Sequence, residues 1–336
     1  MLEKNDFISL QHGSGGRSYH ELVERVFVPA FDNDVLRELN DSALCNMVHE
    51  RIAFTTDSFV VKPLFFPGGD IGRLAVCGTV NDLAMSGAAP RYLSCGMIIE
   101  AGFPVDELAK ISASMAAAAK EAGVAIVTGD TKVVEKGSCD GIFINTAGVG
   151  VLLKAPPVQR LKAGDAIIVS GPIAQHGLAI LAARNDLDFT PELMSDAAPL
   201  NGLVDVLLKA VPTVHALRDA TRGGVAAVLN EWCEASSLSI VVQEDQIPLT
   251  NQTKAACELL GIDPLYVANE GKFVAAVPAD DADAAVAAMR QHPLGNGAGI
   301  IGYADADPIA RVSLNTIYGT RRIIDMPDGE QLPRIC

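Results

Sequence analysis

The sequence lacks the features that define several large classes of protein. Its seven cysteines form no CxxC pair and no tight group with histidine, which excludes the common structural zinc sites and is typical of a reduced cytosolic protein. The first residues do not form a signal peptide, and every apolar run is shorter than the roughly eighteen residues that a membrane helix needs. We therefore expect a cytoplasmic location and no membrane partner.

Basic side chains are also scarce. The 26 lysines and arginines are outnumbered by 41 aspartates and glutamates, which gives a formal net charge of −15. A chain of this charge is repelled by the phosphates of nucleic acids, so we expect no nucleic-acid partner. An anionic ligand would need a local site made of backbone N–H groups, a metal ion or a few basic side chains.

The common nucleotide-binding motifs are missing as well. No lysine is followed by Ser or Thr, which excludes a P-loop. One GxGxxG pattern occurs at Gly297–Gly302, but it runs into YADADP and does not open a helix after a strand. We interpret it as a turn that leads into a strand.

What is present is an alternation of strand and helix patterns in both halves of a chain of 336 residues, which suits two α/β (α+β) domains. A Gly-rich arm and a helix occupy residues 1–42, and the first domain covers 43–154. The Pro156–Pro157 pair interrupts helix and strand alike and marks the boundary. The second domain covers 155–324, and 325–336 form a flexible tail.

Three aspartates follow strands or lie at helix starts, with Gly and Thr beside them: Asp57, Asp82 and Asp130. Carboxylates in such places can collect Mg²⁺, which prefers oxygen ligands and bridges to substrate phosphates. Taken singly, each aspartate could equally cap a helix or a turn. We predict that together they form a magnesium site.

Two Gly-rich loops are candidates for contacts with a nucleotide. HGSGGR contributes Gly13, Gly15 and Gly16, and DATRGGV opens a helix and contributes Arg222. Backbone N–H groups at a helix start favour an anion, and an arginine can add two hydrogen bonds to phosphate. The alternative is a flexible leader and an ordinary helix cap.

The last residue is a cysteine, Cys336, at the end of a polar tail. Twelve extended residues, 325–336, reach about 40 Å, enough to carry a thiol from an internal site to an external donor. A thiol has an ordinary pKa of about 8.5 and would depend on its docking site for activation, with Arg334 partly offsetting the terminal carboxylate. The alternative is an exposed cysteine with no role.

Several segments together resemble one ATP-binding superfamily, that of aminoimidazole ribonucleotide synthetase, selenophosphate synthetase and thiamine monophosphate kinase. They are HGSGGR, TTDSF, FFPGGDIGRLAVCGTVNDLAMSGA, TGDTKVVE, DATRGG and NEGK. Within it, PLFFPGGDIGRLAVCGTVNDLA and the terminal PRIC closely resemble the hydrogenase-maturation carbamoyl dehydratases. The resemblance implies a two-domain aminoimidazole ribonucleotide synthetase-like fold, a homodimer paired through its N-terminal sheets, and ATP with Mg²⁺ in the first domain.

The resemblance also implies roles for residues that the motifs carry. Cys336 would receive a carbamoyl group from a partner carbamoyltransferase, and ATP would dehydrate it to a thiocyanate. The cyano group would pass to the iron of a [NiFe] hydrogenase, held on a maturation scaffold. Lys132 and Glu270 match positions that assist deprotonation, and Asn81 and Thr131 lie in segments that contact ATP.

Alternatives remain open from sequence. Lys132 could be a phosphate clamp instead of a base, and Glu270 could be a structural partner of Lys272 or a helix-cap carboxylate. The protein could be another enzyme of the superfamily, such as selenophosphate synthetase, although HGSGG lacks that enzyme's reactive cysteine. It could also be a nucleotide-regulated assembly protein whose tail only docks a partner.

Overall fold

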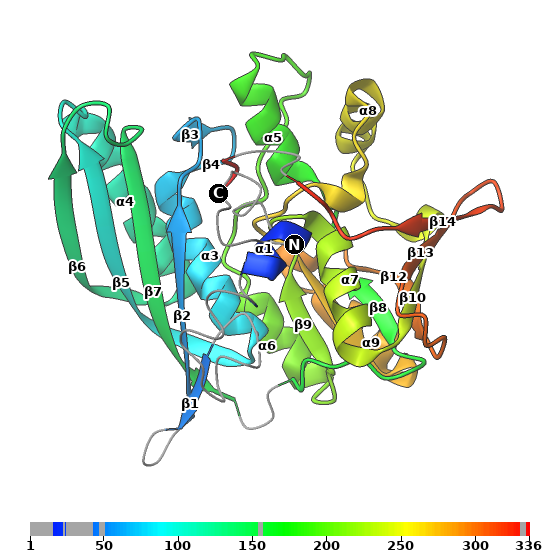
Figure 1. Cartoon of the computed structure of the whole chain (residues 1–336). Coiled ribbons are helices and arrows are strands. Elements are labelled where there is room, and N and C mark those ends of the chain that lie inside the picture. Colours follow the sequence, from blue (N-terminus) through cyan, green and yellow to red (C-terminus); the bar gives the residue numbers. More distant parts are fainter. Residues whose placement is uncertain (1–15, 23, 25–42, 47–50, 154–156, 330–333) are drawn as a thin grey trace.

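The structure, a computed structural model, describes residues 16–22, 24, 43–46, 51–153, 157–329 and 334–336. Most of the predicted N-terminal arm, including Gly13 and Gly15, therefore lies outside the described residues. Helix α1 (Arg17–Leu22) is the described part of the arm's predicted helix. Figure 1 shows two sheets, each backed by helices, with the C-terminus lying between the two halves beside β3 and β4.

The first domain is a five-stranded sheet in the order β1-β2-β7-β5-β6. Its elements are β1 (Ala43–Asn46), β2 (Arg51–Phe59), α3 (Ile71–Met85), β5 (Ala88–Glu100), α4 (Val105–Ala122), β6 (Ala125–Val134) and β7 (Ile142–Leu152), with a small hairpin of β3 (Phe65–Phe66) and β4 (Gly69–Asp70). β5 and β6 are parallel, and the other pairs are antiparallel.

Helix α3 is buried around almost its whole circumference. Asp70 caps it by accepting from the backbone N–H groups of Gly72 (2.7 Å) and Arg73 (3.0 Å). Its apolar residues follow no single face, as expected of a helix enclosed on all sides. One side packs on β2 and β7, and its C-terminal end, with Ala84 and Met85, enters a core of the second domain.

The other face of the first sheet is open. Large apolar side chains remain exposed there and along the edge strand β6, among them Phe54, Tyr92, Ile98, Val127 and Val133. An apolar patch of this kind is a common mark of protein association.

The second domain is a seven-stranded sheet in the order β14-β13-β10-β12-β8-β11-β9. Its strands are β8 (Ala166–Val169), β9 (Ala216–Asp219), β10 (Ser239–Gln243), β11 (Phe273–Val277), β12 (Gly299–Asp305), β13 (Val312–Asn315) and β14 (Arg321–Ile324). Its α-helices are α5 (Gln175–Arg184), α6 (Asn201–Ala210), α7 (Gly224–Ser236), α8 (Asn251–Leu260) and α9 (Ala282–Met289).

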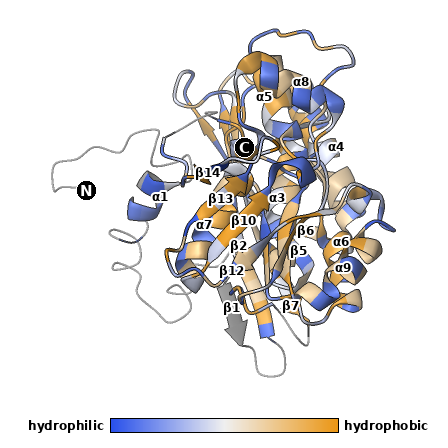
Figure 2. Cartoon of the chain, turned by 90° about the vertical axis from the view of Figure 1, so that its right-hand side faces the viewer, coloured by the Kyte–Doolittle hydropathy of each residue, from blue (hydrophilic) through white to orange (hydrophobic). Residues whose placement is uncertain are grey.

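Helices cover both faces of this sheet, so alternate strand residues enter different cores. Ile167 and Val169 of β8 pack in the core that contains α7, whereas Ala166 and Ile168 pack in the core of α6 and α9. This explains the continuous apolar runs of the strands of this sheet, and Figure 2 shows β10 and β13 largely in orange.

The alternation of strands and helices predicted from the sequence is present in both domains, and the helix predicted to open at DATRGGV is α7, which begins at Gly224. The prediction missed α8, which the signals in its own sequence could have revealed. Thr250 caps its start and Gly261 ends it with φ +67°. The prediction of an α/β (α+β) two-domain fold is confirmed.

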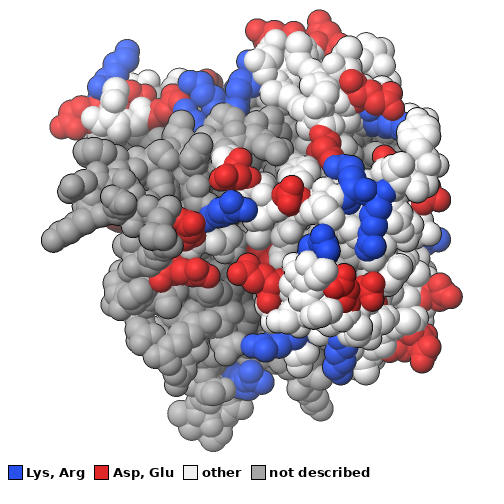
Figure 3. All heavy atoms as spheres, turned by 45° about the vertical axis from the view of Figure 1, so that its right-hand side comes forward, with Lys and Arg blue, Asp and Glu red and all other residues white. Residues whose placement is uncertain are grey.

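Two surface properties bear on partners. On the face shown in Figure 3, acidic and basic side chains lie intermixed, so the net negative charge does not gather in one acidic patch there. Within the described part of the chain, no helix combines the length and apolar character that crossing a membrane requires.

The amide of Asn81 fastens α3 to the second domain. Its Nδ2 donates to the carbonyl oxygens of Ala198 and Glu270, both at 3.2 Å, and its Oδ1 accepts from Leu200 N–H at 2.7 Å. The side chain is 1% exposed. The side-chain amide of Asn81 is committed to these main-chain groups, and its expected contact with ATP stays a prediction.

We expect Asn81→Leu to lower the free energy of unfolding by about 3 kcal/mol or more, since three buried main-chain groups lose their partner. Denaturant unfolding measures this loss. Asn185→Ala is the matched control, because the Asn185 amide is exposed and bonds only to Leu181 O of its own helix. Equal, small losses in the two variants would contradict the assigned role.

Candidate functional site

The first part of the site lies between β2 and α3. Asp57 and Thr55 lie on the face of β2 that packs on the helix, and Thr55 donates to Asp82 at 2.8 Å. Gly78, one turn before Asp82, leaves room for the Phe59 ring of β2, since a Cβ there would lie 2.9 Å from Phe59 Cζ, and it lies in ordinary contact range of Asp57 Oδ2. Two of the three predicted metal ligands, Asp57 of β2 and Asp82 of α3, thus lie where the strand packs on the helix.

The second part comes from the other domain and adds charge. Asp219 ends β9, and Arg222 follows it in the loop before α7. Burial raises the pKa of Asp57, while Arg222 and the backbone N–H of Ser58 oppose the rise. Residues of both domains therefore meet around a group of carboxylates with Arg222 beside them.

Glu270 is the most deeply buried acid of this group, with 2% of its surface exposed, and its Oε1 has no hydrogen-bond partner. Burial raises its pKa well above the ordinary value, and Asp219, Asp57 and Asp196 raise it further against Arg222. The folded protein therefore disfavours ionisation of this carboxyl. An orphaned buried oxygen of this kind points to a ligand or a reacting group.

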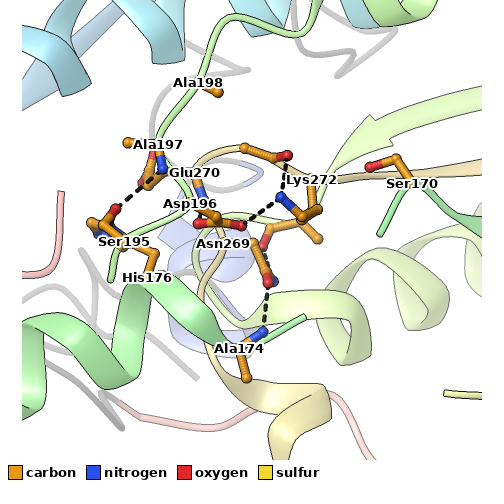
Figure 4. Close-up of polar contacts among 12 residues, drawn as sticks. Ser170, Ala174, His176, Ser195, Asp196, Ala197, Ala198, Asn269, Glu270 and Lys272 are labelled. Carbon is orange, nitrogen blue, oxygen red and sulfur yellow. Dashed lines mark hydrogen bonds and ion pairs between the residues drawn. The ribbon is translucent and has the colours of Figure 1, made fainter. Parts of the chain in front are cut away.

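The backbone of Glu270 is fixed from one side. Asp196 Oδ1 accepts from Glu270 N–H at 3.1 Å, and Asp196 also forms an ion pair with Lys272 at 3.4 Å (Figure 4). Lys272, which was a candidate partner for the Glu270 side chain, pairs with Asp196 instead. The carboxyl of Glu270 is left for the site.

The last three residues of the tail enter this site. Val60 N–H donates to Cys336 O (3.1 Å) and Lys62 N–H to Arg334 O (3.2 Å), the pattern of an added antiparallel strand. Ile335 is 5% exposed in the first core, and Cys336 packs beside it. The tail was expected to be flexible; its end is docked here.

Basic groups hold the docked tail at its entrance. The guanidinium of Arg334 pairs with Asp140, which Lys62 also contacts at 3.2 Å, and Arg184 donates to Arg334 O at 2.8 Å. Arg334 was expected to offset the terminal carboxylate beside the thiol. The cation that lowers the pKa of Cys336 is Arg222 instead.

The docked thiol is neutral. Burial raises the pKa of Cys336 far above its ordinary value; Glu270, Asp57 and Asp219 raise it further, and Arg222 opposes them. A thiolate is the nucleophilic form of cysteine, so the docked thiol is a poor nucleophile. The position suits a neutral group carried on sulfur.

The two Gly-rich loops meet at the base of the tail. Arg17 N–H donates to Pro327 O at 3.3 Å, and a Cβ on Gly16 would lie 2.1 Å from that oxygen. A Cβ on Gly223 would lie 3.0 Å from Pro327 Cγ. Both glycines have positive φ, so the close approach of Pro327 depends on them.

Asp130, Thr131 and Lys132 lie elsewhere in the chain. They are exposed on edge strand β6, separated from β2 by β7 and β5, about 14 Å at the usual strand spacing. Lys132 pairs in register with Ile98, on the open face of the sheet, and forms an ion pair with Asp130 at 3.1 Å. The expected cluster of Asp57, Asp82 and Asp130 is therefore wrong within one chain.

No group of three or more His, Cys, Asp or Glu side chains with metal-binding geometry occurs among the described residues. Sequence reasoning also missed residues that the site brings together: Asp196, Ser195 and Asp219. Asp219 stood in the quoted DATRGG segment, so its motif was the available signal, whereas Ser195 and Asp196 belong to an irregular loop without one.

Comparisons with known proteins agree with this architecture. The AIR synthase related protein N-terminal domain matches residues 40–152, and the corresponding C-terminal domain matches 162–315. A curated relative, carbamoyl dehydratase HypE of Cupriavidus necator, is 52% identical over 99% of this chain and 96% of its own.

Two solved structures are similar over most of the chain. The crystal structure of a HypE–HypF complex has a TM-score of 0.86 at 52% identity, covering 91% of this chain and 99% of that one. A crystal structure of HypE in complex with ATP has a TM-score of 0.82 at 47% identity, covering 98% and 100%. This chain therefore belongs to the AIR synthase related family and, within it, to the HypE carbamoyl dehydratases.

Proposed function

We propose that the protein uses ATP to dehydrate a carbamoyl group, carried on Cys336, to a thiocyanate that supplies the cyanide ligand of [NiFe] hydrogenase iron. The observation that carries this proposal is the docking of the C-terminal cysteine beside β2, where the charges of Glu270, Asp57 and Asp219 act on its thiol. The similar proteins named HypE, one of them with ATP and one with HypF, support it.

Because the docked thiol is neutral, Cys336 is loaded with the carbamoyl group at the partner and the loaded group is dehydrated in the docked site. Because burial and the surrounding acids disfavour the thiolate, loading of the carbamoyl group occurs when the tail is released to a carbamoyltransferase partner. The loaded group, R–S–C(=O)NH₂, carries no charge and returns to the site without the penalty that a thiolate would meet.

The carbamoyl oxygen is a poor leaving group, so it must be phosphorylated before it can depart. The carbamoyl oxygen attacks the γ-phosphate of ATP, and the resulting phosphoryl ester leaves as phosphate while nitrogen loses its protons. The balance is R–S–C(=O)NH₂ + ATP giving R–S–C≡N + ADP + phosphate + H⁺, with the oxygen departing on phosphate. Positioned donors and acceptors supply most of the catalysis in such phosphoryl transfers.

Glu270 fits the role of the base next to the docked cysteine. Its side chain is buried and unpaired, and ionisation becomes easier when a cation joins the carboxylates that now raise its pKa. Mg²⁺ fits the oxygen donors Asp57 and Asp82, and bound there it would neutralise phosphate charge. Arg222 and the glycines Gly13, Gly15, Gly16 would contact the phosphates of ATP.

The complete site needs two subunits. Asp130 and Lys132 lie on the open apolar face of the first sheet, where pairing of two sheets would bury Phe54, Tyr92 and Ile98, and Thr131 lies between them on the same edge strand. In such a homodimer the Asp130–Lys132 pair of one subunit serves the site of the other, as a third magnesium ligand and as base or phosphate clamp.

Intact mass of the Glu-C peptide 331–336 tests the function directly. With the carbamoyl donor system and no ATP, Cys336 should gain one carbamoyl group; on addition of ATP it should lose the mass of one water. Cys336→Ser should stay unmodified. An unmodified wild-type Cys336 beside a demonstrably active donor would overturn the proposal.

Glu270→Gln should separate catalysis from stability. We expect loading of Cys336 to persist and dehydration to fall by two orders of magnitude or more. Since the pKa of Glu270 is raised in the folded state, its ionisation destabilises the protein as pH rises above the ordinary glutamate value of about 4.3. Glu270→Gln should therefore raise Tm at neutral pH, by about 2–4 °C per kcal/mol, and not at pH 4.

The matched control is Glu192→Gln, on the surface of the second domain, which should leave both Tm and dehydration unchanged. A Glu270→Gln variant that dehydrates the loaded group at the wild-type rate would remove Glu270 from the mechanism.

Mixed dimers test the assignment of Lys132 across the subunit interface. Lys132→Ala and Glu270→Gln subunits, each inactive alone, are unfolded, mixed and refolded together. About a quarter of wild-type dehydration should return, because half of the random dimers are mixed and each has one intact site. If both residues act within one subunit, the mixture stays inactive.

A further inference from the structure

His176 is a buried residue that the reaction described above does not use. It lies in the first turn of α5, its side chain is 0% exposed, and its ring meets Phe66 edge-on at a centroid distance of 5.6 Å. Its two ring nitrogens make specific contacts, one of them with the tail.

The tail offers His176 a backbone carbonyl. The carbonyl oxygens of Arg334 and Cys336 point toward the segment after β2, where they accept from Lys62 and Val60. In an extended chain the carbonyl of the residue between them, Ile335, points the opposite way. There, Ile335 O lies 2.8 Å from His176 Nε2, across 159 residues of sequence.

The other ring nitrogen determines which one carries the proton. Ser195 Oγ accepts from Ala197 N–H at 3.1 Å, as drawn in Figure 4, so its own proton is available to His176 Nδ1 at 2.8 Å. With Nδ1 as acceptor, neutral histidine carries its proton on Nε2 and donates it to Ile335 O. Burial lowers the pKa of His176, against Asp196 and the Ile335 carbonyl, which keeps the ring neutral.

The segment that orients His176 also orients Glu270. Ser195 contacts the histidine, and the next residue, Asp196, accepts from Glu270 N–H and pairs with Lys272. Ala197 and Ala198 supply carbonyls to Arg73 and Asn81 of the first domain. One short segment thus sets the positions of the tail and of the base relative to each other.

We propose that His176, oriented by Ser195, is a positioning residue that holds the penultimate carbonyl of the tail and so keeps the loaded Cys336 beside Glu270 during dehydration. This inference rests on the proposed function. Because the contact is to backbone, it is the same whether sulfur carries hydrogen, a carbamoyl group or a cyano group. The contact therefore stabilises the docked position of the tail whichever of these groups the sulfur carries.

Three variants separate a hydrogen bond from packing. His176→Gln keeps an amide donor near the place of Nε2, His176→Leu keeps apolar volume without a donor, and Ser195→Ala removes the group that fixes the tautomer. The first readout is the rate at which iodoacetamide alkylates Cys336, followed on peptide 331–336. The second is single-turnover dehydration of protein loaded beforehand.

His176→Leu should speed alkylation of Cys336 about tenfold and slow dehydration about tenfold, as loss of one buried hydrogen bond allows. Loading by the carbamoyl donor should not slow. His176→Gln should stay within about threefold of wild type in all three rates, and Ser195→Ala should fall between the two. Buried Cys233 is the internal control, since its alkylation reports global opening.

The proposal is overturned if His176→Leu leaves both rates at wild-type values, if His176→Gln is as impaired as His176→Leu, or if Cys233 alkylation rises in step with Cys336. Should His176→Leu fail to fold, His176→Gln and Ser195→Ala decide. Alkylation needs neither donor nor ATP. A wild-type protein that never loses water would refute the proposed function while alkylation still tests the role of His176.

Discussion

The arrangement of the site depends on the hydrogen bonds that Asn81 makes across the domain boundary. α3 carries Asp82 and packs on the strand of Asp57, while the second domain carries Glu270 and the segment Ser195–Ala198. The Asn81 amide joins these parts by main-chain contacts that are independent of side-chain charge. A buried amide with all its partners in place fixes relative position strongly, because each lost partner is costly.

The electrostatics of the site follow from this fixed arrangement. Asp57, Asp219 and Glu270 are brought near one another and near Cys336, with Arg222 as the opposing cation. Carboxylates held together in a buried place keep one of their number protonated, and they keep a neighbouring thiol protonated too. The folded protein therefore disfavours ionisation of two acids, the carboxyl of Glu270 and the thiol of Cys336, and a bound cation would oppose this effect on both.

Local sequence signals predicted the elements well but not the site across them. Neighbouring residues determine where α3 begins, at its Asp70 cap, and where the helix at Gly223–Gly224 begins. The same is true of α8, although its local signals were missed. The placement of Asp130 was wrong within one chain because it depends on strand order and on which face of β6 a residue occupies, neither of which a strand's own sequence determines. His176 and Ser195 act through contacts with distant segments, so no periodic pattern marks them.

The position of Pro327 has a consequence for kinetics. Held between Gly16 and Gly223, it leaves nine residues, 328–336, as a tether with a reach of about 30 Å. A substrate joined to its enzyme by so short a tether meets the site at an effective concentration in the millimolar range, whatever the amount of protein in the cell. Dehydration is then a first-order event for each loaded molecule, and dilution slows only the encounter with the donor.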